Sequence, residues 1–148
     1  MTQDKRVLVP AQPLEPGDRY GVLSDFAPGT RTLKAGFRIA PPFQALPVDI
    51  VLDKDVAVTL RDGVKIYVDV SRPMGTQKVP VLIACSPYGK GQSTARSAMG
   101  VFELVGLEHG IVSGLQKFEG PDPAYWCARG YAICNPDVLI ADKYYTVA

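Results

Sequence analysis

The sequence predicts an α/β fold built on a mixed sheet, and three observations lead to this prediction. Two alternating segments, residues 55–60 and 64–70, flank an Asp-Gly pair. A continuous apolar run follows at residues 79–85. A short capped helix at residues 124–129 then leads into another apolar segment at residues 131–135. A hairpin followed by a strand, a crossover helix and a strand gives a sheet with antiparallel and parallel neighbours, covered by helices.

The antiparallel hairpin is predicted by the periodicity of its strands and by the chemistry of its turn. Apolar and polar side chains alternate in residues 55–60 and 64–70, which is typical of strands with one buried face. Asp62 and Gly63 lie between the two segments, and Asp-Gly supplies the positive φ that a tight hairpin turn needs. Pro73 is expected to end the second strand, because proline cannot donate to the sheet ladder.

The later elements are predicted by apolar runs and by capping residues. Consecutive apolar positions at residues 79–85 predict a central strand covered on both faces. The helix has Asp122 at its N-cap, Pro123 at its first position and Gly130 just past its end, where a left-handed residue is favoured. Residues 131–135 are predicted to form the strand that follows it.

The chain divides into three parts in this interpretation. Residues 1–47 are rich in proline and glycine and lack a sustained period, so an extended arm over the core is expected, with a disordered leader as the alternative. Residues 48–138 carry the regular structure. Residues 139–148 form a tail with no clear partner in the predicted sheet. Glycines weaken the helix signal of residues 97–108.

Composition narrows the classes of function. The 148 residues are 47% hydrophobic and 21% charged, as in an ordinary globular domain. A net charge of +1 gives no field that attracts nucleic acid or an anionic membrane surface. No apolar run approaches the roughly 18 residues of a membrane span, and the N-terminus has no apolar signal core, so a cytoplasmic location is expected. No phosphate-binding glycine loop or metal-ligand spacing occurs, so neither a cofactor nor a metal is expected.

The sharpest functional motif is Ser-Pro-Tyr-Gly-Lys at residues 86–90, directly after the apolar run. Residues 58–64, 67–73 and 126–132 carry further ordered motifs, the last being Trp-Cys-Ala-Arg-Gly-Tyr-Ala. Together these segments resemble the N-terminal portion of the CocE/NonD (X-Pro dipeptidyl-peptidase-like) hydrolases. The resemblance covers residues 55–138 and no more of the chain.

This resemblance implies an incomplete α/β-hydrolase sheet, made of the N-terminal hairpin and two further strands. The family cleaves esters or amides through an acyl-enzyme and uses a Ser-Asp-His triad. By resemblance, Tyr88 is the tyrosine whose hydroxyl helps to form the oxyanion hole. One such donor typically supplies about 3 to 4 kcal/mol of transition-state stabilisation. The alternative is that Tyr88 is a turn residue that packs over the end of a strand.

The family pattern stops after residue 138. The nucleophile elbow Gly-x-Ser-x-Gly occurs nowhere in the sequence, and its nearest imitation places Ser93 a few residues past Tyr88 with no strand before it. The single histidine, His109, is expected to be an exposed loop residue. The elbow and the triad are therefore expected to be missing from this chain.

Cysteine chemistry offers one other nucleophile. Cys85 adjoins the motif, but a thiol nucleophile there needs His109 as its base, and nothing in the sequence brings the two together. The three cysteines are instead interpreted as small buried hydrophobes in a reducing compartment.

Two hypotheses of function follow. In the first, the chain is the N-terminal part of a serine hydrolase whose substrate is a small ester or amide, and it is inactive alone. In the second, it is a non-catalytic relative that binds a partner. The hydrolase strand order places another strand beside residues 79–85, and this chain does not supply it. An open sheet edge is therefore expected, and it favours self-association.

Overall fold

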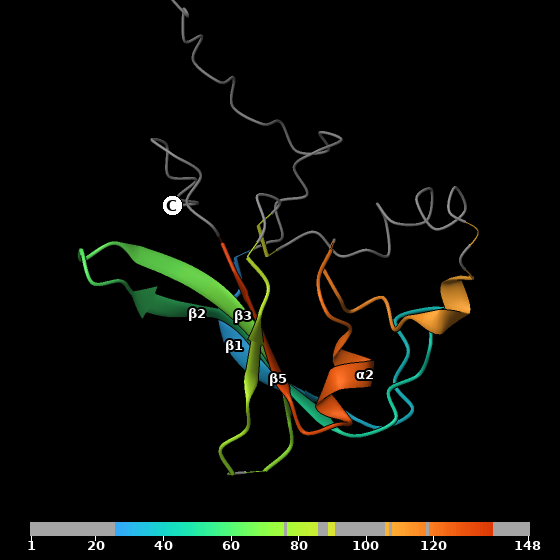
Figure 1. Ribbon diagram of the computed structural model, residues 1–148. Helices are drawn as coiled ribbons and strands as arrows, with labels where there is room; N and C mark the ends of the chain where they lie inside the picture. The colour runs from blue at the N-terminus through green and yellow to red at the C-terminus, as the bar shows by residue number, and fades with distance from the viewer. Residues whose placement is uncertain are drawn as a thin grey trace, which may run out of the picture.

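The computed structural model describes residues 26–75, 77–85, 89–90, 106, 108–117 and 119–137. These residues form five strands, one 3-10 turn and one short helix (Figure 1). In chain order they are β1 (Gly29–Leu33), β2 (Ile50–Thr59), β3 (Lys65–Pro73), β4 (Val81–Ile83), η1 (His109–Ile111), α2 (Pro123–Cys127) and β5 (Ala132–Pro136).

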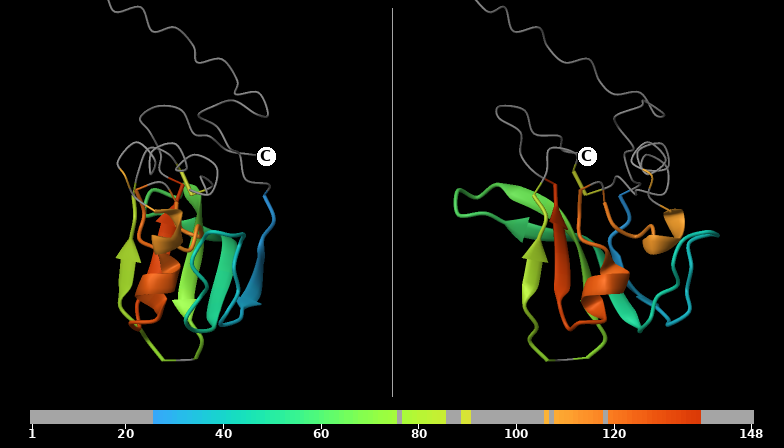
Figure 2. Two further views of the ribbon diagram at one scale, coloured as in Figure 1. Left: turned by 90° about the vertical axis from the view of Figure 1, so that its right-hand side faces the viewer. Right: turned by 45° about the vertical axis from the view of Figure 1, so that its right-hand side comes forward.

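The strands form one mixed sheet, as the sequence predicts. Their order across the sheet is β1-β2-β3-β5-β4. The neighbours β1–β2, β2–β3 and β3–β5 are antiparallel, whereas β4 and β5 are parallel. The parallel pair is joined by a long connection that contains α2, and α2 lies beside β5 in both views of Figure 2. The sheet with few helices agrees with part of a hydrolase-like fold.

The predicted hairpin is present and is longer than its alternating core. Leu60 and Val64 close the turn, with the amide of Leu60 donating to the carbonyl of Val64 at 2.7 Å. Gly63 has a φ of 87°, which is the left-handed conformation that the Asp-Gly pair predicts. The pairing continues from Thr59 with Lys65 down to Ile50 with Pro73, past an irregularity between Asp53 and Val56.

A fifth strand lies within the segment predicted to be an extended arm. β1 pairs antiparallel with β2, with Leu33 opposite Ile50. Four of its five residues are exposed and only Leu33 is buried, so the strand has no alternating pattern that would reveal it in the sequence. β1 forms a strand because it pairs with the edge of β2, and the composition of β1 alone does not predict this pairing. Residues 1–25 lie outside the described part of the chain.

The prediction of a central strand covered on both faces at residues 79–85 is wrong for the described structure. β4 has only three paired residues and lies at the edge of the sheet. Val81 and Ile83 are 51% and 66% exposed. The apolar run in the sequence predicts buried side chains. Within the described residues, however, only β5 pairs with β4, and no described layer covers the side chains of Val81 and Ile83.

The helix α2 has the predicted N-cap and ends at Cys127, two residues before the predicted end. The carboxylate of Asp122 accepts a hydrogen bond from the amide of Ala124, Pro123 occupies the first turn, and Gly130 has a φ of 80°. Ala124 and Cys127 face a core cluster that also contains buried side chains from β1, β2 and the loop between them: Leu33, Leu46 and Ile50. The core therefore lies between α2 and the β1–β2 end of the sheet.

Other predictions fall on residues that are not described, including most of 97–108 and the tail at 139–148. Within the described residues, no helix has the length and apolar character needed to cross a membrane.

Candidate functional site

The predicted site residue Tyr88 and the neighbouring residues 86–87 lie outside the described part of the chain, as does Ser93. The backbone is described again at Gly89 and Lys90, the last two residues of the motif. His109 lies in η1, but its side chain is not among those described. The described part of the site therefore consists of residues that flank Tyr88 in the sequence and of their contacts.

The parallel pairing of β4 and β5 places the exit of both strands at one edge of the sheet. The amide of Ala84, just past β4, donates to the carbonyl of Cys134 at 3.0 Å. The amide of Lys90 donates to Oδ1 of Asp137, just past β5, at 2.9 Å. Ala84 and Lys90, on either side of the undescribed residues 86–88, thus both lie at the carboxyl end of β5. The carboxyl ends of strands are where open α/β sheets bind their ligands.

Lys90 is buried at this edge and is paired with two carboxylates. Its ammonium group forms an ion pair with Oδ1 of Asp55 and lies 3.3 Å from Oδ2 of Asp137. The side chain of Lys90 is 7% exposed and that of Asp55 is 0% exposed. Buried charges are expensive unless they are paired and hydrogen-bonded, and both conditions are met here.

Asp55 reaches Lys90 because β2 is locally distorted. The register between β2 and β3 shifts between Asp53 and Val56, and Asp55 has a φ of 54°, the left-handed region that few residues other than glycine adopt. Such a bulge redirects a side chain out of the regular alternation. The amide of Asp55 donates to Oδ1 of Asp69 at 2.8 Å, and Oδ2 of Asp55 accepts from the amide of Ala27 at 2.7 Å.

The electrostatics of this cluster follow from burial and pairing. Burial alone favours the neutral form of Asp55, but hydrogen bonds from Lys90 and Ala27 and nearby lysine charges outweigh it and lower its pKa. For Lys90, burial opposes the charge, and the hydrogen bond to Asp55 with the neighbouring carboxylates raises the pKa. For Asp69 burial dominates over the hydrogen bond from Asp55, and the pKa is raised.

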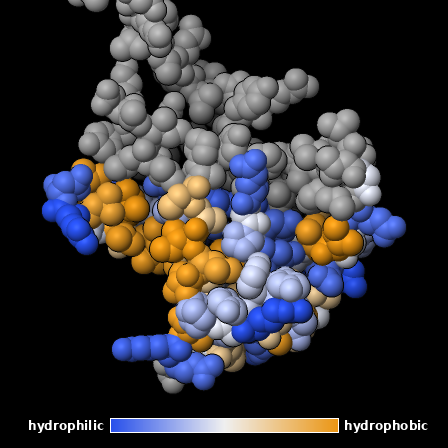
Figure 3. Space-filling model, viewed as in Figure 1, coloured by the Kyte–Doolittle hydropathy of each residue, from blue (hydrophilic) through white to orange (hydrophobic). Residues whose placement is uncertain are grey.

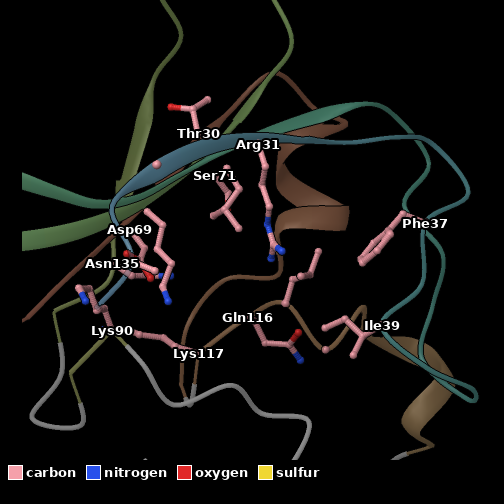
Figure 4. Close-up of a pocket in the computed structure, with 16 residues that line it drawn as sticks. Thr30, Arg31, Phe37, Ile39, Asp69, Ser71, Lys90, Gln116, Lys117 and Asn135 are labelled. Carbon is pink, nitrogen blue, oxygen red and sulfur yellow. The ribbon is translucent and has the colours of Figure 1, made fainter. Parts of the chain in front are cut away.

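A cavity of about 690 Å³ lies next to this cluster, between the sheet and residues 114–117. Its volume is within the range of small-molecule pockets. Figure 4 shows that side chains from the sheet and from the loop converge on it, among them Arg31, Asp69, Lys90 and Lys117. Lys117 is buried, donates to the carbonyl of Gly89 at 3.5 Å, and has a pKa lowered by burial.

The cysteines differ from their interpretation as three buried hydrophobes. Cys127 is buried and Cys134 is partly buried, but Cys85 is exposed. Burial, with the negative charge of Asp122, raises the pKa of the Cys127 thiol to about 11, which makes it a poor nucleophile near neutral pH. All three thiols are free. The pairing of Cys85 with His109 is not tested, because the imidazole lies outside the described side chains.

The sequence interpretation missed the residues that hold the turn. Lys90 was noticed only as part of the motif, and neither Asp55 nor Asp69 was singled out. The sequence did contain a signal for these two residues. Asp55 and Asp69 lie in strands whose alternating pattern predicts one buried face, and an unpaired carboxylate on such a face costs free energy. Lys90, the partner of Asp55, is 35 positions away along the chain, a separation that local patterns do not reveal. Among the described residues, no three of the His, Cys, Asp and Glu side chains gather as metal ligands.

Comparison with solved structures agrees with the fold of the sheet. Two solved structures of a CocE/NonD family hydrolase from Staphylococcus aureus share the fold, each with a TM-score of 0.57. Their sequences are 24% and 23% identical to this one, over 76% and 82% of this chain. The matched region is 18% and 20% of those hydrolase chains, so this chain spans about a fifth of their length.

A curated relative with higher identity matches a shorter segment. It is the L-tyrosine:2-oxoglutarate aminotransferase ucdG of Aspergillus ustus, 39% identical over 67 residues. The match covers 45% of this chain but 13% of that protein, so the aminotransferase activity in its name belongs to a protein of which this chain spans a small part.

The family assignment comes from the segment that holds β3, β4, the motif at residues 86–90, α2 and β5. The sequence profile of the X-Pro dipeptidyl-peptidase (S15) family matches residues 62–139, which is just over half of the 148-residue chain. This match confirms the resemblance that the ordered motifs indicated. The chain therefore belongs to the X-Pro dipeptidyl-peptidase (S15) family and is a relative of its hydrolases.

Proposed function

We propose that this chain forms the N-terminal part of a serine hydrolase site that cleaves a small ester or amide, with Tyr88 as an oxyanion-hole donor. The observation that carries the proposal is the return of the chain, at Lys90, to the carboxyl end of β5. The amide of Lys90, two residues after Tyr88 in the sequence, donates to Asp137 at the carboxyl end of β5, and this supports the proposal because open α/β sheets bind ligands at that edge.

The chemistry that this edge supports is the stabilisation of a tetrahedral oxyanion. In acyl transfer a serine oxygen attacks the carbonyl carbon, and the carbonyl oxygen gains negative charge in the transition state. A hydroxyl that donates a hydrogen bond at that oxygen lowers the barrier, and it is worth more in a site from which water is excluded. The cavity beside Lys90 and Lys117 offers room for a small substrate next to the turn.

The nucleophile belongs, in this proposal, to sequence outside these 148 residues. No Gly-x-Ser-x-Gly elbow is present in the sequence, and a serine hydroxyl without an activating base is a weak nucleophile. The isolated chain is therefore expected to hydrolyse no ester. In the full-length polypeptide that contains it, the serine, the acid and the histidine of the triad are expected to complete the site.

Labelling with a fluorophosphonate probe tests whether the nucleophilic serine lies outside the 148-residue chain. The full-length polypeptide is expected to be labelled at one serine beyond Ala148, and the 148-residue chain is expected to remain unlabelled under the same conditions. Cleavage of a p-nitrophenyl ester should follow the labelling. Stoichiometric labelling of the isolated chain would show that it contains an activated serine of its own. A full-length polypeptide that neither labels nor cleaves would overturn the hydrolase proposal.

A second candidate function is a partner-binding module that acts through the edge strand β4. Exposed apolar side chains lie on this strand, at Val81 and Ile83, and on the hairpin, at Val56 and Val58. Figure 3 shows apolar surface over the projecting hairpin and down the adjacent part of the sheet. An exposed apolar edge strand is a template for pairing with another strand. The partner that fits best is a second copy of this chain, paired edge to edge.

The compartment is proposed to be the cytoplasm. All three cysteines are free, and the one beside the functional turn is exposed. Free thiols persist where glutathione and thioredoxin keep the compartment reducing.

A further inference from the structure

The cavity of about 690 Å³ between the sheet and residues 114–117 has an apolar end and a polar end (Figure 4). Phe37 and Ile39 lie at one end and are 37% and 41% exposed. Lys117 and Asn135 lie at the opposite end and are 2% and 7% exposed. Arg31 extends from β1 into the space between the two ends. A ligand that fills this cavity therefore needs an apolar body with a polar group at one end.

The charges on the wall of the cavity favour an anion as that polar group. The charged side chains that line it are cationic apart from one: Arg31, Lys54, Lys90, Lys117 and the acidic Asp69. Lys54 and Lys90 both lie beside the carboxylate of Asp55. Among the residues that the structure describes, no carboxylate forms an ion pair with Arg31 or Lys117. These two cationic groups are available to a bound anion.

Two buried polar groups at the closed end of the cavity lack good partners. Within the described part of the chain, Oδ1 of Asn135 is buried and accepts no hydrogen bond, although buried polar groups are normally paired. The ammonium group of Lys117 donates to the carbonyl of Gly89 over 3.5 Å, which is longer than the usual range. Burial lowers the pKa of Lys117, and an anion beside its ammonium group would offset that cost.

We propose that this cavity binds a small monocarboxylate with an apolar alkyl or aryl body. The carboxylate lies between Lys117 and Arg31, and the apolar body lies against Phe37 and Ile39. A carboxylate fits because it accepts charge-assisted hydrogen bonds from ammonium and guanidinium groups together. A half-turn of the Asn135 amide offers its NH₂ group as a further donor. The inference goes beyond the proposed function, because binding here requires neither Tyr88 nor a serine nucleophile.

The first test is isothermal titration calorimetry of the 148-residue chain with three probes. We expect 3-phenylpropionate to bind saturably, with one site per chain. Its neutral analogue 3-phenylpropionamide should bind about 10-fold more weakly, because hydrogen bonds to charged groups are the stronger ones. Inorganic phosphate, which has no apolar body, should not displace 3-phenylpropionate. Equal affinity for the acid and the amide, or displacement by phosphate at equal concentration, would overturn the proposal.

The second test places the binding in the cavity by substitution. Lys117→Met and Arg31→Gln should each weaken the binding of 3-phenylpropionate about 10-fold, through the lost charge-assisted hydrogen bonds. Phe37→Ala should also weaken it, through lost apolar contact. The controls Lys78→Met and Arg61→Gln remove the same charges from exposed positions that do not line the cavity, and they should bind as the wild type does.

Circular dichroism checks that each variant is folded. Arg31 lies among the exposed residues of β1, so Arg31→Gln decides the matter even where Lys117→Met does not fold. Wild-type affinity in folded Arg31→Gln, or no saturable binding of 3-phenylpropionate in the millimolar range by the wild type, would overturn the proposal. The hydrolase proposal fails separately, through the absence of serine labelling in the full-length polypeptide, and that result leaves the binding measurement unaffected.

Discussion

At the scale of single residues, one carboxylate connects two segments of the chain. Asp122 caps α2 by accepting from the amide of Ala124 at 2.9 Å. It also accepts from the amide of Ser113 at 2.7 Å and from the hydroxyl of Ser113 at 2.5 Å. The cap was predicted from the sequence, because capping is local. The contact with Ser113, nine residues earlier, was not, because no short-range pattern encodes it.

Replacing Asp122 with alanine removes all three hydrogen bonds. We expect a loss of about 1 to 3 kcal/mol in the free energy of unfolding, from the lost cap and from the buried hydroxyl donor of Ser113, which loses its acceptor. Urea unfolding of the 148-residue chain measures it. Asp49→Ala, at a partly exposed carboxylate that accepts from Lys34 and Ala35, is the control and should cost less. An equal loss in the two variants would contradict the role assigned to Asp122.

The acid sensitivity of the fold also follows from single carboxylates. Burial alone would raise the pKa of Asp53, but hydrogen bonds from Arg72 and Thr30 and the charge of Arg72 lower it. A folded-state pKa below the unfolded value contributes stability above the unfolded pKa and loses it as the pH falls through the folded pKa.

We therefore expect stability to fall as the pH drops below about 4, the ordinary pKa of aspartate. In Asp53→Asn this part of the decline should be absent. Urea midpoints measured from pH 7 downward provide the comparison. Asp69, whose pKa is raised by burial, acts in the opposite direction, because its protonation favours the folded state. An identical acid limb in Asp53→Asn would contradict the account.

At the scale of elements, the structure separates local from non-local information. The hairpin turn at Asp62-Gly63 and the N-cap of α2 were predictable, because turn and cap residues act within a few positions. β1 was missed because its exposed residues carry no period. The prediction that β4 is covered on both faces fails because an apolar run does not show whether the elements that would cover the strand are present.

The turn of the hairpin offers a direct test at this scale. A Cβ at Gly63 would meet no atom within 4 Å, so space is available, but the φ of 87° disfavours any L side chain. Gly63→Ala should cost about 1 to 2 kcal/mol, the penalty of the left-handed conformation. Gly29→Ala, where a Cβ also meets nothing and φ is not left-handed, is the matched control. Equal effects on the urea midpoint would show that the turn conformation is not what makes Gly63 necessary.

At the scale of the whole molecule, the described sheet combines a buried ion pair, Lys90 with Asp55, with an open edge at β4. β4 pairs with β5 on one side, and no described strand pairs with its other side. The sequence predicted this open edge through the family resemblance. It did not predict the buried pair of Asp55 and Lys90 or its contact with the partly exposed Asp137, because the bulge that turns Asp55 toward Lys90 arises only when β2 and β3 pair.

Self-association through this edge is expected for the isolated chain. Ile83 is 66% exposed in β4, and a lysine there would place a charge on the edge. Analytical ultracentrifugation should find concentration-dependent dimers in the wild type and monomers in Ile83→Lys. Lys34→Met, remote from β4 in the sheet order, serves as the control and should associate as the wild type does. A wild-type chain that remains monomeric at all concentrations would contradict edge pairing.

The central claim concerns Tyr88, and the most direct measurement is the kcat and KM of Tyr88→Phe in the full-length polypeptide. Phenylalanine keeps the ring and removes only the hydroxyl donor. The account predicts a kcat lower by about 100- to 1,000-fold, as for other oxyanion donors, with KM nearly unchanged. A kcat equal to that of the wild type would contradict the oxyanion role and leave Tyr88 as a turn residue.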